Sequence, residues 1–369
     1  MSEGLSGWRK CLLGEIITLQ RGFDITQNKQ EAGNYPVVSS SGVKSWHKEW
    51  KVAGPGVVIG RKGTLGTVFY LPDCFWPHDT TLWVKNFHGN FPRFIYYFLN
   101  EFEFARYDVG SSNPTLNRNH VHLVPAYLAP FPEQKAIANV LSSLDGKIDL
   151  LHRQNKTLES MAETLFRHWF IEEAQEDWKI STVGKQLKTV LGGTPSTTNP
   201  EYWGGSIPWI NSGEVNKFRI IEATKFITEL GLRKSNTTLL PKGSTVVAIT
   251  GTTLGQVSLL EIETCANQSV VGLIPNDKLP KEYVFLLIKS KIKEIILSET
   301  GGAQPHINKN DINDTEIVIP PENILSEKTL VFKNFFEKIT TNVFQIQTLE
   351  KLRDTLLPKL MSGEVRVEV

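Results

Sequence analysis

Apolar residues recur at alternating steps of three and four between residues 132 and 170. The series consists of Leu141, Leu144, Ile148, Leu151, Asn155, Leu158, Ala162, Leu165 and Trp169. This spacing is that of a heptad seam, and Asn155 is its one strongly polar inner position. A helix of about 38 residues would be roughly 57 Å long at ~1.5 Å per residue. So long a helix requires a second helix along its seam.

The same pattern returns near the C-terminus and supplies that second helix. Five residues recur at one offset of 191: Thr157, Leu158, Glu159, Thr164 and Leu165 become Thr348, Leu349, Glu350, Thr355 and Leu356. The second seam includes Phe332 and has its own displaced polar position, Asn342, and Gly363 is a stop signal just past its end. Two unrelated amphipathic helices are the alternative, which the identities disfavour. We predict that the helices pair through Leu144, Ile148, Leu151, Leu158, Leu165, Phe335, Ile339, Ile346, Leu349 and Leu356.

A larger repeat encloses these helices. Residues 57–68 (VVIGRKGTLGTV) resemble 246–257 (VVAITGTTLGQV), and 110–121 (GSSNPTLNRNHV) resemble 301–312 (GGAQPHINKNDI). Short β-rich runs separated by Gly, Pro and Asn turns precede a helix in each half. The predicted fold is α+β, with two β-rich mixed α/β domains in tandem. We expect domains at 1–131 and 171–321, a first long helix at 132–170, and a second with a tail at 322–369.

Composition restricts the function only loosely. The 369 residues include no apolar run long enough for a membrane span and no signal-peptide core at the N-terminus. Cys11, Cys74 and Cys265 are scattered and fit a reducing cytoplasm. The net charge is +1, so binding to nucleic acid would require local basic patches.

The order of these parts resembles the specificity subunits of type I restriction-modification systems, over essentially the whole chain. The resemblance is carried by LGE and VGK at 13–15 and 183–185, by the helix start at 130–134, by the NPTLN and QPHIN loops, and by LLPKLMSGEV at 356–365. The second helix starts differently, with PPENILSE and without the Glu-Gln pair of the first.

The resemblance implies an antiparallel pair of helices that holds two target-recognition domains, each reading half of a bipartite site in double-stranded DNA. It further implies that helix length sets the unread spacer and that the helices dock methyltransferase subunits, two in number. Motor-nuclease subunits would join the full complex. The chain itself would then be non-catalytic, and S-adenosylmethionine, ATP and Mg²⁺ would be bound only by partner subunits.

Several strings invite an enzymatic interpretation and are weaker than they look. Asn199-Pro200-Glu201-Tyr202 is close to the NPPY motif of amino-methyltransferases, but the second proline and an upstream glycine-rich cofactor loop are missing. Gly60–Gly66 lacks the ending of a P-loop, and Pro72-Asp73 with Glu133-Gln134-Lys135 mimics a nuclease pattern only at long range. His78, His120 and His306 show no metal-ligand spacing. We therefore predict no catalytic or metal site.

Loop residues with hydrogen-bonding side chains are the candidates for DNA contact. In the first domain they are Lys44, His47, Lys48, Arg61, Lys62, Asn113, Thr115, Arg118 and His120, and in the second Thr197, Thr198, Asn211, Lys217, Arg219, Thr252, Gln304, His306 and Lys309. The asparagines that recur in both repeats, Asn117 with Asn308 and Asn119 with Asn310, are predicted to be structural turn residues.

Positions that differ between the repeats are better candidates for reading bases, because two half-sites usually differ. This favours Arg61-Lys62, set against Gly251-Thr252, and Asn113, set against Gln304, whereas Trp46 and Trp209 could equally be core. Two other functions stay open at this point: a coiled-coil adaptor that binds protein, and a recognition module detached from a methyltransferase or nuclease fusion.

Overall fold

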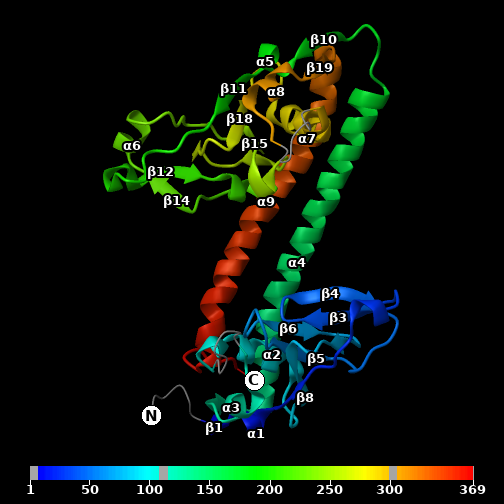
Figure 1. Cartoon of the computed structure of the whole chain (residues 1–369), viewed down its shortest axis with the longest axis vertical. Helices are drawn as coiled ribbons and strands as arrows, with labels where there is room; N and C mark the ends of the chain where they lie inside the picture. The colour runs from blue at the N-terminus through cyan, green and yellow to red at the C-terminus, as the bar shows by residue number, and fades with distance from the viewer. Residues whose placement is uncertain (1–6, 108–114, 299–305, 369) are drawn as a thin grey trace. The chain divides into compact units, whose positions relative to one another are not determined.

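The computed structural model describes residues 7–107, 115–298 and 306–368. Its contacts divide the chain into two compact units (Figure 1). Unit 1 comprises Met1–Ile148 with Thr348–Val369, and unit 2 comprises Asp149–Gln347. Each long helix therefore contributes one part to each unit.

Unit 1 contains three antiparallel or mixed sheets and a small set of helices. Its four-stranded sheet has the order β2 (Thr18–Arg21), β8 (Thr81–Asn86), β5 (Gly56–Gly60) and β6 (Val68–Leu71). The three-stranded sheet has the order β4 (Gly42–His47), β3 (Tyr35–Ser39) and β7 (Trp76–Pro77), and β1 (Arg9–Leu12) pairs with β9 (Pro125–Leu128). The helical segments are α1 (Leu13–Ile16), η2 (Gln27–Lys29), α2 (Pro92–Asn100), η3 (Phe104–Tyr107) and α3 (Arg118–His122).

The core of unit 1 lies between its largest sheet and α2. Strand β5 is buried at every position, which its apolar sequence GVVIG allows. Pro92 starts α2 at a position where a missing N–H costs nothing. The helix then buries Phe94 and Phe98, whose rings stack with centroids 5.7 Å apart.

Unit 2 repeats this order with one extra strand. Its five-stranded sheet has the order β11 (Lys188–Leu191), β18 (Val270–Ile274), β15 (Thr245–Ala248), β16 (Val257–Leu260) and β13 (Arg219–Ile220). The smaller sheets are β14 (Lys225–Ile227), β12 (Trp203–Ile210) and β17 (Cys265–Ala266), and β10 (Lys179–Thr182) with β19 (Glu316–Ile319). Its helical segments are α5 (Val183–Gln186), η5 (Pro200–Tyr202), η6 (Ser212–Asn216), α6 (Glu229–Arg233), η7 (Gly251–Thr253), α7 (Lys281–Ser298) and α8 (Lys309–Asp314).

Equivalent backbone hydrogen bonds show that the two units share one scaffold. The N–H of Gly22 donates to the carbonyl of Thr81 at 3.0 Å, and that of Gly192 donates to Val270 at 2.9 Å. A Cβ at either glycine would lie 2.1 Å from the carbonyl oxygen of a neighbouring strand end, so only glycine fits. The predicted tandem repeat is confirmed at this level.

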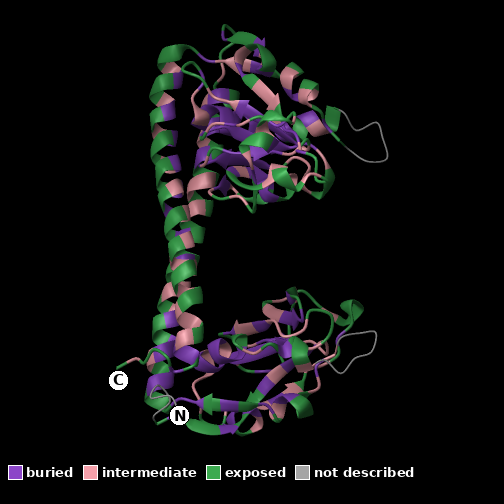
Figure 2. Cartoon of the chain, turned by 90° about the vertical axis from the view of Figure 1, so that its left-hand side faces the viewer, coloured by how far each residue is buried: buried purple, intermediate pink, exposed green. Residues whose placement is uncertain are grey.

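Two long helices contribute to both units. Helix α4 spans Phe131–Arg167 and continues as one π-helical segment, His168–Glu172, and α9 spans Glu322–Met361. Buried and half-buried residues follow one face of each helix, while the opposite faces are exposed (Figure 2). All ten predicted pairing residues lie on these inward faces. At two of them the phase differs, because Leu165 and Phe335 are only half-buried whereas their neighbours Phe166 and Phe336 are each 2% exposed.

Contacts between the helices can be followed within each unit. In unit 2 the ring of Phe332 lies 6.3 Å from that of Phe166, and Asn342 Nδ2 donates to Asn155 Oδ1 at 2.8 Å. Residue 155 of α4 contacts residue 342 of α9, and the later residue 166 contacts the earlier residue 332, so these segments run antiparallel. In unit 1 Arg353 Nη1 lies 3.2 Å from Asp145 Oδ1.

A buried carboxylate marks the start of α4 in unit 1. Glu133 is 3% exposed and accepts hydrogen bonds from Trp8 Nε1 at 3.0 Å and from Arg366 Nε and Nη2 at 2.5 and 2.8 Å. At the offset of 191 the second helix has Ile324, and Trp178, the repeat partner of Trp8, has a buried indole N–H without a partner. The missing Glu-Gln pair thus changes the local packing. In the described part of the chain no helix is long and apolar enough to cross a membrane.

Candidate nucleic-acid interface

Two loops of unit 1 bond to the carbonyl group of Thr80, and a third loop is attached to one of them. The backbone N–H groups of Arg61 and Lys62 donate to it at 2.9 and 3.1 Å, and Ser40 Oγ donates at 2.5 Å. The loop before α3 joins them, because Leu116 N donates to the carbonyl of Arg61 at 3.0 Å and Lys62 forms a β-bridge with Thr115. Two of the predicted contact stretches, Arg61-Lys62 and the segment from Thr115, are thereby brought together.

Asp79 organises the charges at this point. Its carboxylate accepts a hydrogen bond from Arg21 Nη2 at 2.7 Å, and Arg61 Nη1 donates to its backbone carbonyl at 3.4 Å. We call Arg21, Arg61, Lys62, His78 and Asp79 the Asp79 cluster. Burial alone would raise the pKa of Asp79, but the hydrogen bond from Arg21 and the nearby positive charges hold it below its ordinary value. Burial and the charge of Arg21 lower the pKa of Arg61.

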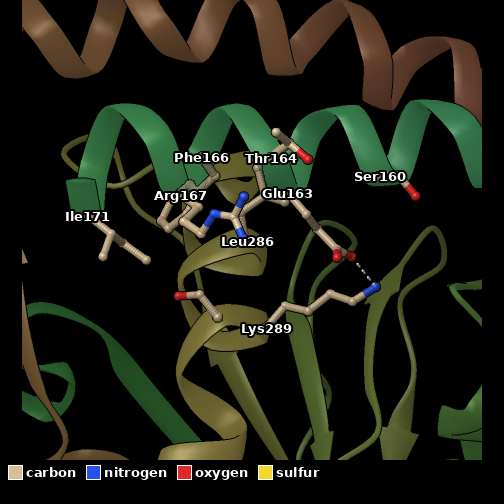
Figure 3. A pocket seen from close by; sticks show the side chains of 9 residues that line it. Ser160, Glu163, Thr164, Phe166, Arg167, Ile171, Leu286 and Lys289 are labelled. Carbon is tan, nitrogen blue, oxygen red and sulfur yellow. Dashed lines mark ion pairs between the residues drawn. The ribbon is translucent and has the colours of Figure 1, made fainter. Parts of the chain in front are cut away.

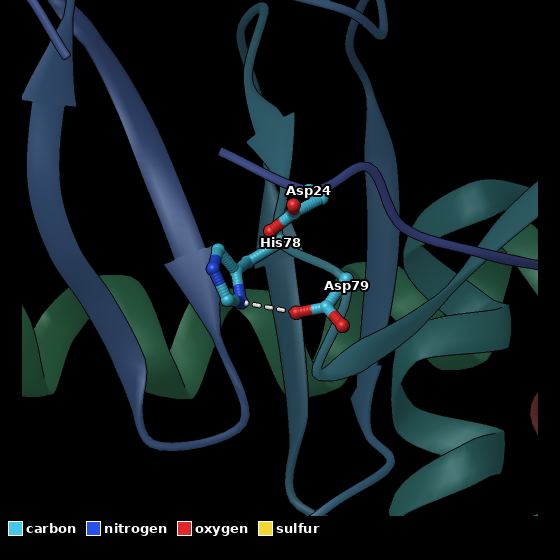
Figure 4. Close-up of side chains that lie close together, drawn as sticks. All are labelled: Asp24, His78 and Asp79. Carbon is cyan, nitrogen blue, oxygen red and sulfur yellow. Dashed lines mark ion pairs between the residues drawn. The ribbon is translucent and has the colours of Figure 1, made fainter. Parts of the chain in front are cut away.

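His78 belongs to the same cluster and lies beside two carboxylates. Its Nδ1 is 3.1 Å from Asp79 Oδ1, and Asp24 lies next to them (Figure 4). One ligand atom from each of the three side chains falls within 4.8 Å of the others, a spacing that could hold a metal ion and that the linear sequence did not indicate. The guanidinium on Asp79 opposes a cation there, so we interpret the group as an ion-pair network.

The remaining predicted residues of unit 1 are spread over β4 and α3. Lys44 is exposed, and Lys48 is exposed with its Nζ 2.8 Å from Glu31. His47 is 4% exposed, and its Nδ1 accepts a hydrogen bond from Glu31 N at 3.0 Å. The prediction that His47 contacts DNA is therefore wrong in this structure, because its ring faces inward from the strand. Trp46, in contrast, is 56% exposed and is not core.

Helix α3 confirms the turn role of one recurring asparagine and exposes its neighbours. Asn117 Oδ1 accepts a hydrogen bond from Asn119 N at 3.0 Å as an N-cap, and Asn308 caps α8 in the same way. Arg118 and His120 are exposed beside the cap. Asn113 and Gln304 lie outside the described residues.

The equivalent cluster in unit 2 has a different chemistry. Ile249 N donates to Ser269 O at 2.9 Å, as Arg61 N does to Thr80 O, so Ile249 stands in the place of Arg61 and Thr250 in that of Lys62. The sequence alignment, which set Arg61-Lys62 against Gly251-Thr252, is thus out of register, because the unit 2 loop is one residue longer between the bonded pairs Gly60–Gly66 and Ala248–Gly255.

Two further positions of this second cluster follow from the same framework. Leu191 precedes Gly192 as Arg21 precedes Gly22, and Gln268 stands where unit 1 has Asp79. Gln268 is exposed, and its Oε1 accepts a hydrogen bond from Thr194 Oγ1 at 2.5 Å.

Other predicted residues of unit 2 are mainly on its surface. Exposed or half-buried positions hold Thr197, Thr198, Asn211, Lys217, Thr252, His306 and Lys309. Asn211 is a cap, since its Oδ1 accepts from Gly213 N at 2.7 Å. Trp209 is core, 5% exposed, with its indole donating to Gly193 O at 3.0 Å.

Arg219 is the clearest correction to the predicted contacts. Its side chain is 0% exposed, its guanidinium lies 4.0 Å from the ring centre of Phe218 and 4.5 Å from that of Phe336, and its Nε is 3.6 Å from Glu261 Oε1. Burial lowers its pKa to about 9, although Glu261 and Glu282 oppose the shift. Strand β13 turns this arginine into the core, where it cannot reach DNA.

A cavity of about 420 Å³ separates α4 from α7 within unit 2. Glu163 and Arg167 on α4 face Lys289 on α7, and Lys289 Nζ lies 2.8 Å from Glu163 (Figure 3). Lys289 also pairs with Glu159. Burial lowers the pKa of Lys289 to about 8. These ion pairs connect α7 to α4 within unit 2.

The comparisons with known proteins identify the family. The type I restriction modification DNA specificity domain matches residues 6–160 and 175–351, which is the repeat already described. The chain belongs to that family.

Individual relatives agree with this assignment. The MjaIX specificity subunit of Methanocaldococcus jannaschii is 30% identical over 309 residues, covering 76% of this chain and 70% of the relative. The EcoR124I/EcoR124II specificity subunit of Escherichia coli is 27% identical over 179 residues, covering 47% of this chain and 43% of the relative. The solved S subunit from M. genitalium has a similar fold, with a TM-score of 0.67 at 17% identity and 96% coverage of both chains.

The structure also points to residues that sequence reasoning passed over. Arg21 and Asp79 were not among the candidates, because they are 58 residues apart in sequence. In the structure Arg21 Nη2 lies 2.7 Å from Asp79 Oδ2. The available signal was Arg21-Gly22 standing opposite Leu191-Gly192 in the repeat, which marked a position where the two halves differ.

Proposed function

We propose that this chain is the DNA-recognition subunit of a type I restriction-modification complex, in which each unit reads one half of a bipartite duplex site. The observation that carries the proposal is the divergence of side chains on a common scaffold. Equivalent hydrogen bonds hold the loops of both units, yet Arg21 and Asp79 in one unit are replaced by Leu191 and Gln268 in the other. A protein that reads two different half-sites with one fold requires this arrangement.

The long helices have the role of a spacer in this proposal. We infer that α4 and α9 pair along their length as an antiparallel coiled coil, and that their length fixes the gap between the two half-sites. The antiparallel contacts in unit 2 and the ion pair of Arg353 with Asp145 in unit 1 support this. The polar pair of Asn155 and Asn342 in the seam also supports it, since such pairs fix register.

The outer faces of the helices are proposed to dock the methyltransferase subunits, two per complex, with motor-nuclease subunits joining the full assembly. Exposed apolar side chains on these faces support the docking role. They include Leu150 and Met161 on α4, exposed by 41% and 45%, and Leu330 and Leu352 on α9, exposed by 63% and 45%. Apolar groups are enriched at the centre of protein interfaces.

We further propose that the chain itself catalyses no reaction and acts in the cytoplasm. S-adenosylmethionine, ATP and Mg²⁺ would then be bound by the partner subunits. A direct check is to incubate the purified chain with duplex DNA and S-adenosylmethionine. Methyl transfer by the chain alone would refute this part of the proposal.

The main experiment expresses the chain with the methyltransferase subunit from the same genome in a host that lacks such methylation. Single-molecule sequencing then maps modified adenines. We expect methylation at one two-part motif with a gap of constant length, and none when the chain is omitted. Methylation that is the same with and without the chain would contradict the recognition role.

A further inference from the structure

The Asp79 cluster differs from its equivalent in unit 2 in a way that bears on which base pairs are read. Among the described residues, unit 1 presents Arg21 and Asp79 where unit 2 presents Leu191 and Gln268. Resting on the proposed function, we propose that Arg21 and Asp79 read a G·C base pair in the half-site of unit 1. The corresponding position of unit 2 reads an A·T pair.

The geometry of Arg21 suits guanine recognition. Its side chain is 52% exposed, so part of the guanidinium is open to a ligand. One edge is already fixed, with Nη2 on the Asp79 carboxylate at 2.7 Å and Nε on the Asp79 carbonyl at 3.4 Å. An arginine held in this way loses less rotamer freedom on binding and can present its donors to the O6 and N7 acceptors of guanine.

The carboxylate distinguishes base reading from phosphate binding. Asp79 has a lowered pKa and is ionised at neutral pH, so it would repel a phosphate group placed on the same arginine. Towards a base pair it is useful, because a carboxylate accepts a hydrogen bond from the N4 amino group of cytosine. An Arg–Asp pair therefore matches the donors and acceptors on the major-groove edge of a G·C pair.

The other two cations of the cluster have different tasks. Arg61 is partly buried and donates to the Asp79 carbonyl, which makes it a positioning residue for the loop. Lys62 is exposed, and we assign it to the DNA backbone, where a lysine acts as a point charge.

Unit 2 offers the complementary set of contacts. Gln268 is exposed, and its oxygen accepts a hydrogen bond from Thr194, which orients the amide. Such an amide can pair with the N6 and N7 atoms of adenine. Leu191 is 42% exposed and has no polar atom on its side chain, so it suits the methyl group of thymine.

The test measures binding of the full chain to duplexes that carry the mapped bipartite site, with each base pair of each half-site replaced in turn. For the wild type we expect one G·C pair in the unit 1 half-site whose replacement weakens binding by about 5- to 150-fold. Arg21→Leu, which installs the unit 2 residue, should abolish that discrimination. Arg21→Lys keeps the charge but loses the paired donors of the guanidinium. It should also abolish the discrimination while retaining affinity for non-specific DNA.

Two controls separate the possible outcomes. Lys62→Ala should weaken binding to all duplexes alike and lower the salt dependence by about one charge. If Arg21→Leu behaves like Lys62→Ala, Arg21 contacts phosphate and the inference is overturned. A unit 1 half-site that tolerates replacement of every G·C pair also overturns it. If the wild type shows no salt-sensitive, site-specific binding, the proposed function itself fails.

Discussion

Replacing Glu261 by alanine is expected to destabilise unit 2 strongly. Glu261 is 5% exposed and compensates the charge of Arg219, whose guanidinium is enclosed by aromatic rings and whose Nε and Nη2 have no hydrogen-bond partner. With a pKa of about 9, Arg219 is still charged at pH 7. Glu261→Ala therefore leaves the buried charge of Arg219 without its ion-pair partner, for which the loss is about 3–5 kcal/mol.

The reciprocal change should be far milder. Arg219→Met keeps the apolar packing, and Glu261 retains the Thr340 hydroxyl at 2.5 Å and Lys242 Nζ at 3.5 Å. We expect the free energy of unfolding to stay within about 1–2 kcal/mol of the wild type. The double variant that combines Arg219→Met with Glu261→Ala should be more stable than Glu261→Ala alone, because it no longer contains the buried cation of Arg219.

The assay must report on unit 2 alone, since two units need not unfold together. Hydrogen–deuterium exchange of β15 and β16 at pH 7 in increasing denaturant gives that readout. Lys242→Met is the control, because its side chain is 58% exposed and its removal leaves Glu261 with Arg219 and the Thr340 hydroxyl, so the cost should be small. If Arg219→Met costs more than Glu261→Ala, the charge-compensation argument is refuted.

Three further changes have defined outcomes. Asn342→Leu should lower the free energy of unfolding by about 1 kcal/mol, because Asn155 loses its hydrogen-bond donor. The double variant with leucine at both 155 and 342 should be near neutral in denaturant unfolding, but it should bind duplexes with altered gaps better than the wild type does. An unchanged gap preference would contradict the register role. Asn117→Ala should lower the melting temperature through a lost N-cap of about 1 kcal/mol, while the methylated motif stays the same. The free energy of unfolding should rise between pH 8 and 10, because the lowered pKa of Lys289 lets the folded state lose this proton before the unfolded state does. Lys289→Met should remove this part of the rise. A pH profile identical to that of the wild type would contradict the prediction.

The elements with strong periodicity were predictable from the sequence. Heptad spacing gives α4 and α9 and the inward direction of their apolar residues, and the repeat gives the shared order of strands. Asn117 was predicted to be a structural turn residue because it recurs in both repeats, and it is the N-cap of α3. The heptad spacing is visible within a short window of residues, and the repeat is visible when the two halves of the sequence are compared.

Features that depend on long-range contact were not predictable. The direction of a side chain from a short strand decides whether a cation is surface or core, and no alternation in the flanking residues showed that β13 turns Arg219 inward. The meeting of Arg21 and Asp79 requires the register of β2 against β8, which only the folded sheet fixes. In the sequence, Asn155 and Asn342 occupy different positions of the repeated seam. They pair because the two helix segments run in opposite directions, and this direction is fixed only in the folded structure.

The carboxylate of Glu133 joins both ends of the described chain to the start of α4. Trp8 is close to one end and Arg366 to the other, and both donate to the same buried side chain. A fusion partner or truncation that displaces residues 364–368 would leave this anion with only the indole N–H. Affinity handles for purification are therefore better placed away from the C-terminal tail.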